Sequence, residues 1–500
     1  MLVTFVILYL LVSIGIGLYA ATRVHSAKDY VVAGRSLPIY IVTATVFATW
    51  FGSETVLGIS STFIKDGLAG IVADPFGSSM CLILVGIFFA AKLYRMNLLT
   101  IGDYYRRRYG RAVELICSMC IVLSYLGWVS AQVIALGLVF NVLSNGSISQ
   151  HEGIAIGTAI VLVYTLFGGM WSVALTDFFQ MTIIMVGMLY IAFVLAGMTG
   201  GVGVVIAHAS EAGKFQFWPE LTAKDVLAFV GAWVTMMFGS IPQQDVFQRV
   251  MSAKNERIAV TGSILGGSLY FLFAFVPIFL AYSALLIDPA MTNQLIEKDA
   301  QLVLPNLILA HTPLFAQVMF FGALLSAIMS TASGTLLAPS VTFSENILRG
   351  FFAHLSDKQF LWITRVVVVC FTGVVLVTAF NSEMSIYGMV ENAYKITLVA
   401  AFIPLVFGLY WKRATTQGAL AAIAAGLSVW LLLEYFEPEG LWPPQLAGLI
   451  AAFLGMIAGS LLPQWVRRRT EHPPEHPLGH AAAHPHAHGP GHTHHHGASN

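Results

Sequence analysis

Two adjacent hydroxyl side chains lie in a segment that is otherwise apolar. Ser330 and Thr331 follow Ala327 by about one helical turn in the stretch Ala327-Ile-Met-Ser-Thr-Ala-Ser333. Oxygen atoms are the ligands that hard cations prefer, by the reasoning that applies to Ca²⁺ and Mg²⁺, and Na⁺ is such a cation. Hydroxyl groups in membrane helices also bond back to carbonyls of their own helix. The segment alone therefore leaves open both an ion site and a structural role.

Ionisable side chains also occur within or beside apolar segments, namely Glu54, Asp74, Asp245, Glu391 and Lys395. A charge inside the bilayer is costly, so residues of this kind usually serve a function. Glu391 and Lys395 are four positions apart, the spacing at which two side chains on one helix meet. For these two residues a structural ion pair is therefore an equally good expectation.

The composition indicates where all these residues lie. Hydrophobic residues make up 57% of the 500-residue chain and charged residues 10%, whereas a soluble domain carries about 25% charged residues. Runs of roughly 20 apolar residues, enough to span a bilayer, recur from end to end. We expect an all-α membrane protein with no separate soluble domain. The formal net charge is zero, so no basic surface suggests nucleic acid as a partner.

Apolar segments bounded by turn residues predict about thirteen transmembrane helices. With the N-terminus outside, 20 Lys and Arg fall in the inner segments, 4 in the outer segments, and Lys395 within a span. This bias predicts an outer N-terminus and a cytoplasmic C-terminus in the plasma membrane. The predicted spans are 2–21, 39–61, 74–93, 112–143, 152–167, 171–198, 225–248, 257–286, 315–346, 359–381, 387–410, 417–435 and 444–464.

The second and seventh predicted spans are interrupted in a similar way. One contains Phe51-Gly-Ser-Glu54 and the other Phe238-Gly-Ser-Ile-Pro242. Glycine is common in membrane helices, but an interruption also frees backbone groups that protein, water or an ion must satisfy. Paired interruptions at matching positions of two halves indicate the binding site of a transporter. Five spans separate the breaks, which predicts inverted repeats over about 39–198 and 225–410.

The C-terminal segment differs from the body of the chain at 1–465. Residues 466–500 hold ten of the fifteen histidines among Pro, Gly and Ala, a composition that is typical of a disordered, cytoplasmic tail. Histidine-rich tracts can bind transition metals weakly, and a solvated tail without a role is an equal alternative. The metal-binding candidates are His492, His494, His495 and His496.

Two longer motifs resemble signatures of one known family. Residues 164–180 read Tyr-Thr-Leu-Phe-Gly-Gly-Met-Trp-Ser-Val-Ala-Leu-Thr-Asp-Phe-Phe-Gln, and residues 408–419 read Gly-Leu-Tyr-Trp-Lys-Arg-Ala-Thr-Thr-Gln-Gly-Ala. Both are similar to signatures of the sodium:solute symporter family, and the resemblance covers roughly residues 1–465. It implies a LeuT-type 5+5 inverted repeat with broken helices in spans 2 and 7, and sodium-coupled import of a small organic solute by alternating access.

The resemblance also implies an ion site between span 2 and span 9, with Na⁺ as coupling ion and no organic cofactor. Two carbonyls would come from the broken second span, and a carbonyl and two hydroxyls from the ninth. The implied sodium-binding residues are Ala48, Phe51, Ala327, Ser330 and Thr331.

The solute is less well defined than the ion. Several stretches are most similar to the high-affinity choline transporter branch, and Trp50 and Trp128 would form two walls of an aromatic cage for a quaternary ammonium group. That branch has a tryptophan where this chain has Gln243, so the cage is incomplete. Thr55 matches a position that contacts the sugar in the sugar transporters of the family but carries no carboxamide, so the resemblance makes a sugar less fitting. Amino acids, zwitterions, organic cations and carboxylates all remain open. The expected solute-binding residues are Trp50, Glu54, Thr55, Asp74, Trp128, Met236, Gly239, Ser240, Gln243 and Asn392.

A transporter-like sensor with a separate signalling partner is the alternative function. An enzyme is not expected, because catalysis needs a preorganised nucleophile, base or metal, and the only dense metal-type cluster lies in the tail. The sequence gives no prediction of the oligomeric state.

Overall fold

The computed structural model describes residues 1–352 and 354–466, and this part of the chain is helical without a named strand. The predicted tail and its four candidate metal-binding histidines lie almost entirely outside the described residues. The helices used below are α1 (Leu2–Ala21), α2 (Ala27–Val32), α3 (Ile39–Trp50), η2 (Glu54–Ile59), α4 (Ser60–Asp66), η4 (Val72–Gly77), α5 (Ser78–Leu84), α6 (Ala91–Arg95), α7 (Ile101–Tyr109), α8 (Arg111–Leu143), α9 (Gln150–Thr199), α11 (Ala223–Gly239), α12 (Gln244–Met251), α13 (Glu256–Ile287), α14 (Pro289–Asp299), η6 (Ala300–Leu302), α16 (Leu314–Thr342), α17 (Asp357–Phe380), α18 (Ile386–Thr397), α20 (Thr416–Phe436) and α21 (Pro444–Leu461).

The all-α prediction is confirmed, whereas the number of spans stays a prediction. Among the described residues, ten helical stretches are long and apolar enough to cross a membrane, or eleven if the bent pair α11 and α12 forms one span. Helix α3 is too short for this criterion. Helix α9 runs over 50 residues, which at 1.5 Å per residue is about 75 Å and far exceeds the hydrocarbon core of a bilayer.

A glycine divides this long helix between the fifth and sixth predicted spans. Gly169 has φ 50° and ψ −138°, a conformation that breaks the helix and that glycine adopts without the strain of a side chain. Tyr164, five residues before Gly169, and Ser172, three residues after it, both lie against Gly17 of α1. The chain therefore turns sharply at this point, as the two-span prediction requires.

Both predicted interruptions are present. Helix α3 ends at Trp50, Phe51 has non-helical angles, and helix resumes as the π-helical turn η2, which continues into α4. Helix α11 ends at Gly239 and α12 begins at Gln244, with a bend of 46° between them. Single π-helical turns occur often at functional sites.

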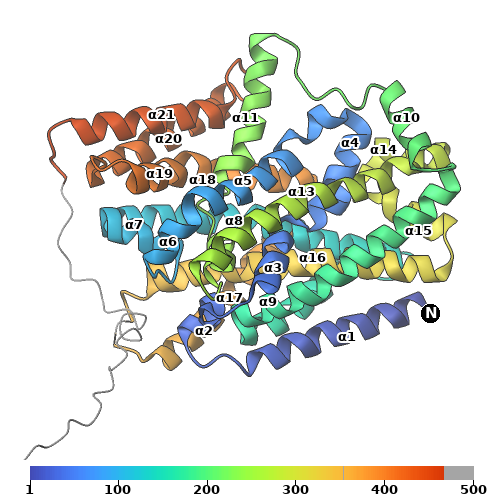
Figure 1. Cartoon of the computed structure of the whole chain (residues 1–500), viewed down its shortest axis with the longest axis horizontal. Helices are drawn as coiled ribbons and strands as arrows, with labels where there is room; N and C mark the ends of the chain where they lie inside the picture. Colours follow the sequence, from blue (N-terminus) through green and yellow to red (C-terminus); the bar gives the residue numbers. More distant parts are fainter. Residues whose placement is uncertain (353, 467–500) are drawn as a thin grey trace, which may run out of the picture. The chain divides into compact units, whose positions relative to one another are not determined.

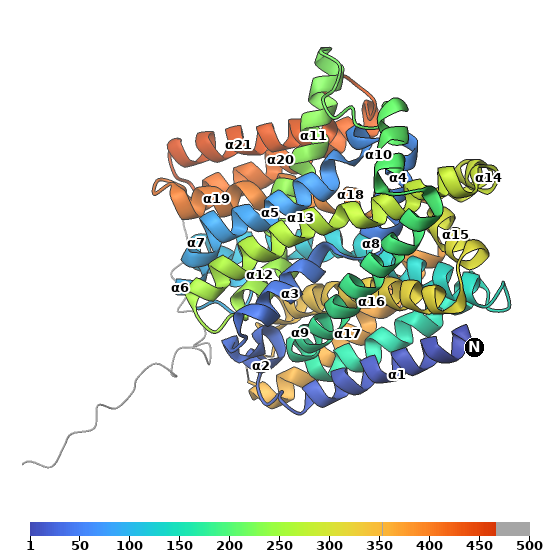
Figure 2. The same cartoon turned by 45° about the vertical axis from the view of Figure 1, so that its right-hand side comes forward.

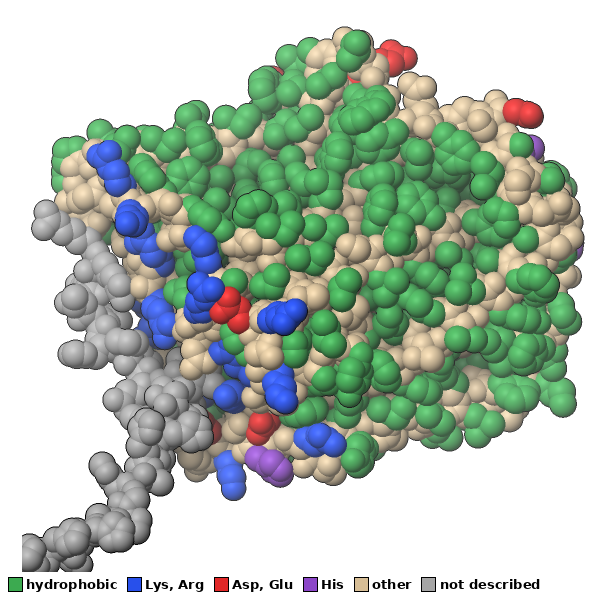
Figure 3. Space-filling model, in the orientation of Figure 1, with side chains coloured by type: hydrophobic (Ala, Val, Ile, Leu, Met, Phe, Trp, Pro, Cys, Tyr) green, Lys and Arg blue, Asp and Glu red, His purple; other side chains and the backbone are tan. Residues whose placement is uncertain are grey.

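The helices pack as a bundle whose centre holds the broken second span. In both views, α1 lies at one side of the bundle and α20 with α21 at the opposite side, while α3, α8, α13 and α16 lie between them (Figures 1 and 2). Apolar side chains cover most of the face in Figure 3. Many large apolar side chains are exposed, among them Leu272 of α13 at 69%. Lys and Arg gather at one end of this face, near α2, α6 and α7. An apolar belt with basic residues at one end is the arrangement that a bilayer requires.

Candidate ion and solute site

Helices α3 and α16 meet at the residues expected to hold sodium. The Thr331 hydroxyl donates a hydrogen bond to the Ala48 carbonyl at 3.2 Å, and the Ser330 hydroxyl donates to the Ala327 carbonyl at 3.2 Å. All four residues and Phe51 are fully buried. The bond within α16 is the structural role noted for such hydroxyls, but the bond between helices places oxygen atoms of both elements together. Their role as ion ligands stays a prediction.

The absence of a side chain at Gly52 allows this contact. A Cβ atom built on Gly52 would lie 2.6 Å from the Thr331 hydroxyl oxygen and 2.6 Å from a Glu54 carboxylate oxygen. Any larger residue would collide with both groups. The break in the second span thus lies directly between the hydroxyl of α16 and the carboxylate of η2.

Glu54 is fully buried and is held by two side chains of α8. Gln132 donates to one carboxylate oxygen at 2.7 Å, and the Trp128 indole N–H donates to the other at 3.3 Å. Gln132 also accepts a hydrogen bond at 3.0 Å from the backbone N–H of Ser53. One amide side chain therefore fixes both the broken backbone and the acidic group that follows it.

Aromatic side chains gather beside Glu54. The rings of Trp50 and Trp128 stack with centroids 5.1 Å apart, and Tyr394 of α18 meets them at 5.6 Å and 5.4 Å. Tyr125 also stacks on Trp128, with ring centroids 5.8 Å apart. The predicted pair of tryptophans is thus part of a larger aromatic cluster, which we define as Trp50, Tyr125, Trp128 and Tyr394.

Asp74 joins the site through Tyr270 of α13. The Tyr270 hydroxyl donates to the Asp74 carboxylate at 2.5 Å and lies 3.1 Å from the Thr55 hydroxyl, which in turn donates to the Trp50 carbonyl at 2.8 Å. Ser78 donates a further hydrogen bond to Asp74. The predicted residues Thr55 and Asp74 are therefore connected by one polar chain.

The second break is closed by hydrogen bonds to neighbouring helices. Thr397 of α18 donates to the Gly239 carbonyl at 2.7 Å. The Gln243 amide donates to Ser124 at 3.0 Å and to Thr397 at 3.2 Å. Gln243, predicted as a solute-binding residue, thus links α8 to α18 by hydrogen bonds across the second break.

Several polar atoms at the two breaks are buried without a hydrogen-bond partner among the described residues. A buried polar group without a partner is costly and calls for an explanation such as a bound ligand or ion. At this site the atoms are Trp50 Nε1, Ser53 Oγ, Asp74 Oδ2, Ser240 Oγ and Tyr394 OH.

The structure does not bring every predicted residue into the cluster. Asn392 is exposed on α18, whereas Tyr394, two residues later and not predicted, is buried against the tryptophans. Met236 is buried on α11 and lies near Gly77 of η4. Lys395, for which pairing with Glu391 was one of two equal expectations, forms an ion pair with Glu434 of α20, whose carboxylate lies 3.6 Å from its ammonium.

A buried charge network lies beside the ion site and was not predicted. The Arg249 guanidinium lies 3.3 Å from the Asp245 carboxylate and 3.6 Å from that of Asp177 on α9. Thr45 of α3 donates to Asp177 at 2.5 Å and accepts from Arg249 at 3.2 Å. Asp245 is therefore paired within this network, and it also contacts the aromatic cluster. The Tyr125 hydroxyl donates a hydrogen bond to its carboxylate and accepts one from its backbone N–H at 2.9 Å. Only the position of Asp245 beside a break signalled a role in the sequence.

Two helices of the bundle are broken, and one break holds buried oxygen atoms, a buried carboxylate and aromatic rings. This combination defines a secondary transporter of the LeuT-type fold. The sequence model of the family described as "Sodium:solute symporter family" matches residues 30–426 of the chain. The chain belongs to the sodium:solute symporter family, and it functions as a sodium-coupled symporter of a small organic solute.

Characterised relatives share this family but differ in their solutes. The chain is 27% identical over 456 residues to the human high affinity choline transporter 1, which covers 85% of this chain and 75% of that protein. It is 25% identical over 460 residues to the high-affinity proline transporter PutP of Bacillus subtilis, which covers 90% of this chain and 95% of the relative. The sensor alternative finds no support in these comparisons.

Solved structures share the fold. A Na⁺-coupled sialic acid symporter in a substrate-bound outward-open state aligns with a TM-score of 0.80 at 18% identity, covering 92% of this chain and 97% of that chain. MhsT in complex with L-phenylalanine aligns with a TM-score of 0.55 at 14% identity, covering 85% and 98%. The fold expected from the sequence is confirmed.

Proposed function

We propose that this symporter imports a small organic ammonium compound, either a cation or a zwitterion, from outside the cell. The observation that carries the proposal is the buried Glu54 carboxylate beside the stacked rings of Trp50 and Trp128. An ammonium group is attracted both by a carboxylate and by the faces of aromatic rings. A carboxylate solute without an ammonium group would meet like charge at Glu54 and Asp74.

The relatives fit this class without defining one member of it. Choline is a quaternary ammonium cation and proline is a zwitterion with an ammonium group, and each is named in a relative described above. The chain lacks the tryptophan of the choline branch at Gln243, which favours a solute that does not need a full aromatic cage. Tyr394 supplies a third ring from α18.

Sodium would couple to this solute through the contact between α3 and α16. A Na⁺ ion held by Ala48, Phe51, Ala327, Ser330 and Thr331 would link the broken span to α16, and the solute would bind on the other side of the same break. Ion and solute would then stabilise the same outward-open or occluded state, so each would raise the affinity for the other by an equal factor. An inner-negative potential of 100 mV would add about 2.3 kcal/mol per charge.

We further propose that the protein lies in the plasma membrane with its N-terminus outside. The clustering of Lys and Arg at one end of the bundle supports this orientation (Figure 3), because basic residues concentrate on the cytoplasmic side. The segment after α21 would then be cytoplasmic.

Uptake into proteoliposomes tests the proposal. Radiolabelled choline, L-proline and succinate, a carboxylate without an ammonium group, are offered under an inward Na⁺ gradient and under equal gradients of K⁺ or Li⁺. We expect uptake of at least one ammonium compound with Na⁺ alone, and no uptake of succinate. Uptake that proceeds equally with K⁺ would contradict sodium coupling, and preferred uptake of succinate would contradict the solute class.

A further inference from the structure

Two arginines, Arg23 and Arg365, flank the sharp turn at Gly169. Arg365 of α17 donates a hydrogen bond to the Phe167 carbonyl at 3.5 Å, and its guanidinium carbon lies 5.5 Å from the centre of the Phe167 ring. Arg23, which follows α1, has its guanidinium carbon 5.1 Å from the centre of the Trp171 ring. Phe167 and Trp171 are two residues before and two residues after Gly169, so both guanidinium groups lie beside one turn of the chain.

Neither of these two arginines has an ion-pair partner within the part of the chain that the structure describes. Other arginines do have one. Arg95 pairs with Glu256 at 2.6 Å, and Arg349 pairs with Asp357 at 2.6 Å. The two guanidinium groups beside Gly169 instead lie over aromatic rings, whose faces attract a cation but do not neutralise its charge.

Two nitrogen donors at this turn are buried and have no acceptor among residues 1–352 and 354–466. They are the Nε of Arg365 and the indole Nε1 of Trp171. Both groups can only donate hydrogen bonds. A buried donor without a partner is costly and calls for an explanation such as a bound ligand, and a ligand here must supply acceptor atoms. Two positive charges without a carboxylate and two donors without an acceptor together point to an anion.

An apolar stripe on α17 begins beside this group of donors. Trp362, Val366 and Val369 are spaced by four and three positions, which places them on one face of the helix. They are 61%, 58% and 47% exposed. The centre of the Trp362 ring lies 5.1 Å from the Arg365 guanidinium carbon. An exposed apolar face of this kind in a membrane protein contacts the acyl chains of lipids, so the charged group lies next to a surface suited to lipid.

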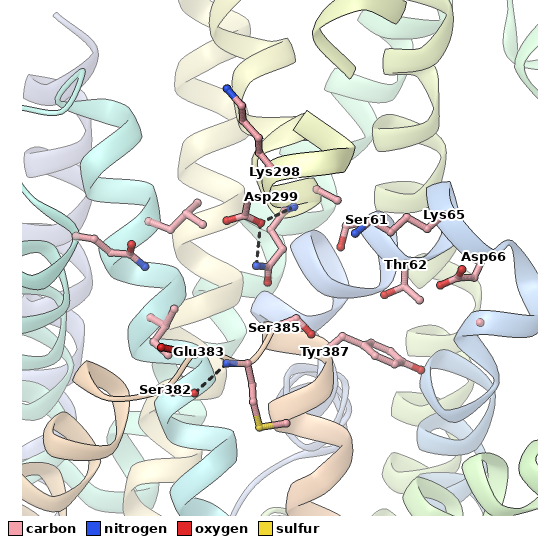
Figure 4. Close-up of a pocket in the computed structure, with 17 residues that line it drawn as sticks. Ser61, Thr62, Lys65, Asp66, Lys298, Asp299, Ser382, Glu383, Ser385 and Tyr387 are labelled. Atoms are coloured by element: carbon pink, nitrogen blue, oxygen red, sulfur yellow. Dashed lines mark hydrogen bonds between the residues drawn. The ribbon is translucent and has the colours of Figure 1, made fainter. Parts of the chain in front are cut away.

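A cavity at the other end of the bundle differs in its charges. It has a volume of about 670 Å³ and opens between α4, α8, α14 and the start of α18. Figure 4 shows that the carboxylates of Asp66 and Asp299 line it together with the side chains of Lys65 and Lys298. Charges of both signs compensate one another in that lining, whereas the two arginines beside Gly169 lack such compensation from the described residues.

We propose that Arg23, Trp171 and Arg365 bind the phosphate group of an anionic phospholipid, whose acyl chains lie along the apolar stripe of α17. Phosphate oxygens accept hydrogen bonds from all three side chains, and the planar fork of arginine fits phosphate well. Basic pockets between membrane helices on the cytoplasmic side are typical sites of lipid headgroups, and the proposed orientation places this turn there. A free phosphate ion offers the same oxygens but makes no use of the stripe.

The bound lipid would connect three helices that are far apart in the sequence. Helix α9 contacts both α1 and α17, and the three helices lie close together in both views (Figures 1 and 2). The first arginine follows α1, the tryptophan belongs to α9 and the second arginine to α17. One phosphate held by all three side chains should therefore stabilise the packing of α1 against the rest of the bundle.

Lipid binding to the purified protein in detergent tests this site. Native mass spectrometry gives the Kd of phosphatidylglycerol, which is anionic, and of phosphatidylcholine, which is zwitterionic. Thermal unfolding compares the stabilisation by phosphatidylglycerol with that by millimolar inorganic phosphate. For the chain as it is, we expect phosphatidylglycerol to bind about tenfold more tightly than phosphatidylcholine, and inorganic phosphate to raise the unfolding temperature little.

Variants locate the binding. Arg23→Gln with Arg365→Gln should raise the Kd of phosphatidylglycerol about tenfold, because two charge-assisted contacts are lost. Arg257→Gln with Arg413→Gln removes the same charge from two exposed arginines outside this group, and it should change the Kd less than about twofold. Trp171→Phe keeps the ring and both charges but loses the N–H, so it should raise the Kd about threefold. This last variant tests the site with the contacts of both arginines retained.

Three results would overturn the proposal. Equal effects of the two arginine pairs would mean that the lipid responds only to total charge. Equal affinity for the two lipids would mean that no anion is recognised. Stabilisation by inorganic phosphate as large as that by phosphatidylglycerol would assign the site to a free anion. None of these measurements involves uptake, so their outcome is independent of the proposed solute.

Discussion

The two broken spans look alike in sequence but are satisfied in different ways. At the first break, Glu54 accepts hydrogen bonds from α8 while the Ala48 carbonyl and the Thr331 hydroxyl meet across α3 and α16. At the second break, Thr397 and Gln243 close the gap with neutral hydrogen bonds. A Gly-Ser interruption thus predicts where backbone groups are freed, whereas the neighbouring helices decide whether a ligand or the protein satisfies them.

The largest effect is expected from removing the hydroxyls that face the first break, which tests whether this break holds the ion. Ser330→Ala with Thr331→Ala should abolish sodium-dependent uptake, because each lost oxygen ligand should weaken sodium binding by about tenfold. The protein should stay folded, since small side chains replace small ones. Uptake measured against Na⁺ concentration, with size-exclusion profiles as a folding check, tests this. Normal sodium dependence in the double variant would show that the ion lies elsewhere.

Removing the charge at the first break should have the next largest effect. Glu54→Gln keeps the size of the side chain but loses the attraction for an ammonium group, so the KM of an ammonium solute should rise by about tenfold or more. Glu434→Gln is the matched control, because Glu434 is an acidic residue that pairs with Lys395 away from the site. Equal effects of both changes would mean that Glu54 has no direct part in solute binding.

A moderate effect is expected at the second break. Gln243→Ala removes the amide that binds Ser124 and Thr397, which should cost about 1–3 kcal/mol of stability because buried partners are left unpaired. The apparent sodium affinity should change little. Thermal unfolding in detergent together with sodium titration separates the two quantities. A large loss of sodium affinity at unchanged stability would show that both breaks serve the ion.

A small effect is expected for Asn392, which lies outside both breaks. Because this side chain is exposed, Asn392→Ala should change stability by at most about 0.5 kcal/mol and leave uptake unchanged. Tyr394→Ala on the same helix should reduce solute affinity clearly, since it removes a ring from the aromatic cluster. Solute KM values of the two variants provide the test. A larger rise of the solute KM for Asn392→Ala than for Tyr394→Ala would show that Asn392 binds the solute.

No change in uptake is expected from deleting residues 471–500. All residues assigned here to the ion, the solute and the two breaks lie between Ala48 and Thr397. Uptake by the truncated chain, compared at equal protein amounts in the membrane, tests this expectation. Lost uptake would assign the histidine-rich segment a role in transport.

Much of the fold was predictable because apolar length, charge bias and paired glycines are local signals. The ion-site residues became predictable only with the family signatures, since two hydroxyls alone fit a structural role equally well. Tyr394 was missed although a signal existed: Met389, Val390, Ala393, Tyr394 and Thr397 form one buried face of α18. Asn392 is two residues from Tyr394, about 200° around the helix, and points elsewhere.

Contacts between distant segments carried no such signal. Lys395 has an acidic residue four positions before it, but its partner Glu434 comes from another helix. Gln132 gave no sign that it would hold both Ser53 and Glu54. The network around Arg249 of α12 joins two further helices, α9 through Asp177 and α3 through Thr45. Such pairings depend on how helices pack, which the spacing of residues along one helix does not specify.

The close approach at Gly52 has a practical consequence for recognising proteins that work in this way. A methyl group there would strike the Thr331 hydroxyl and the Glu54 carboxylate at the same time. A homologous chain with alanine at this position must therefore separate the two helices or give up one of the two polar groups. The residue at this one position therefore distinguishes homologous sequences that can adopt this close helix contact from those that must have a different arrangement.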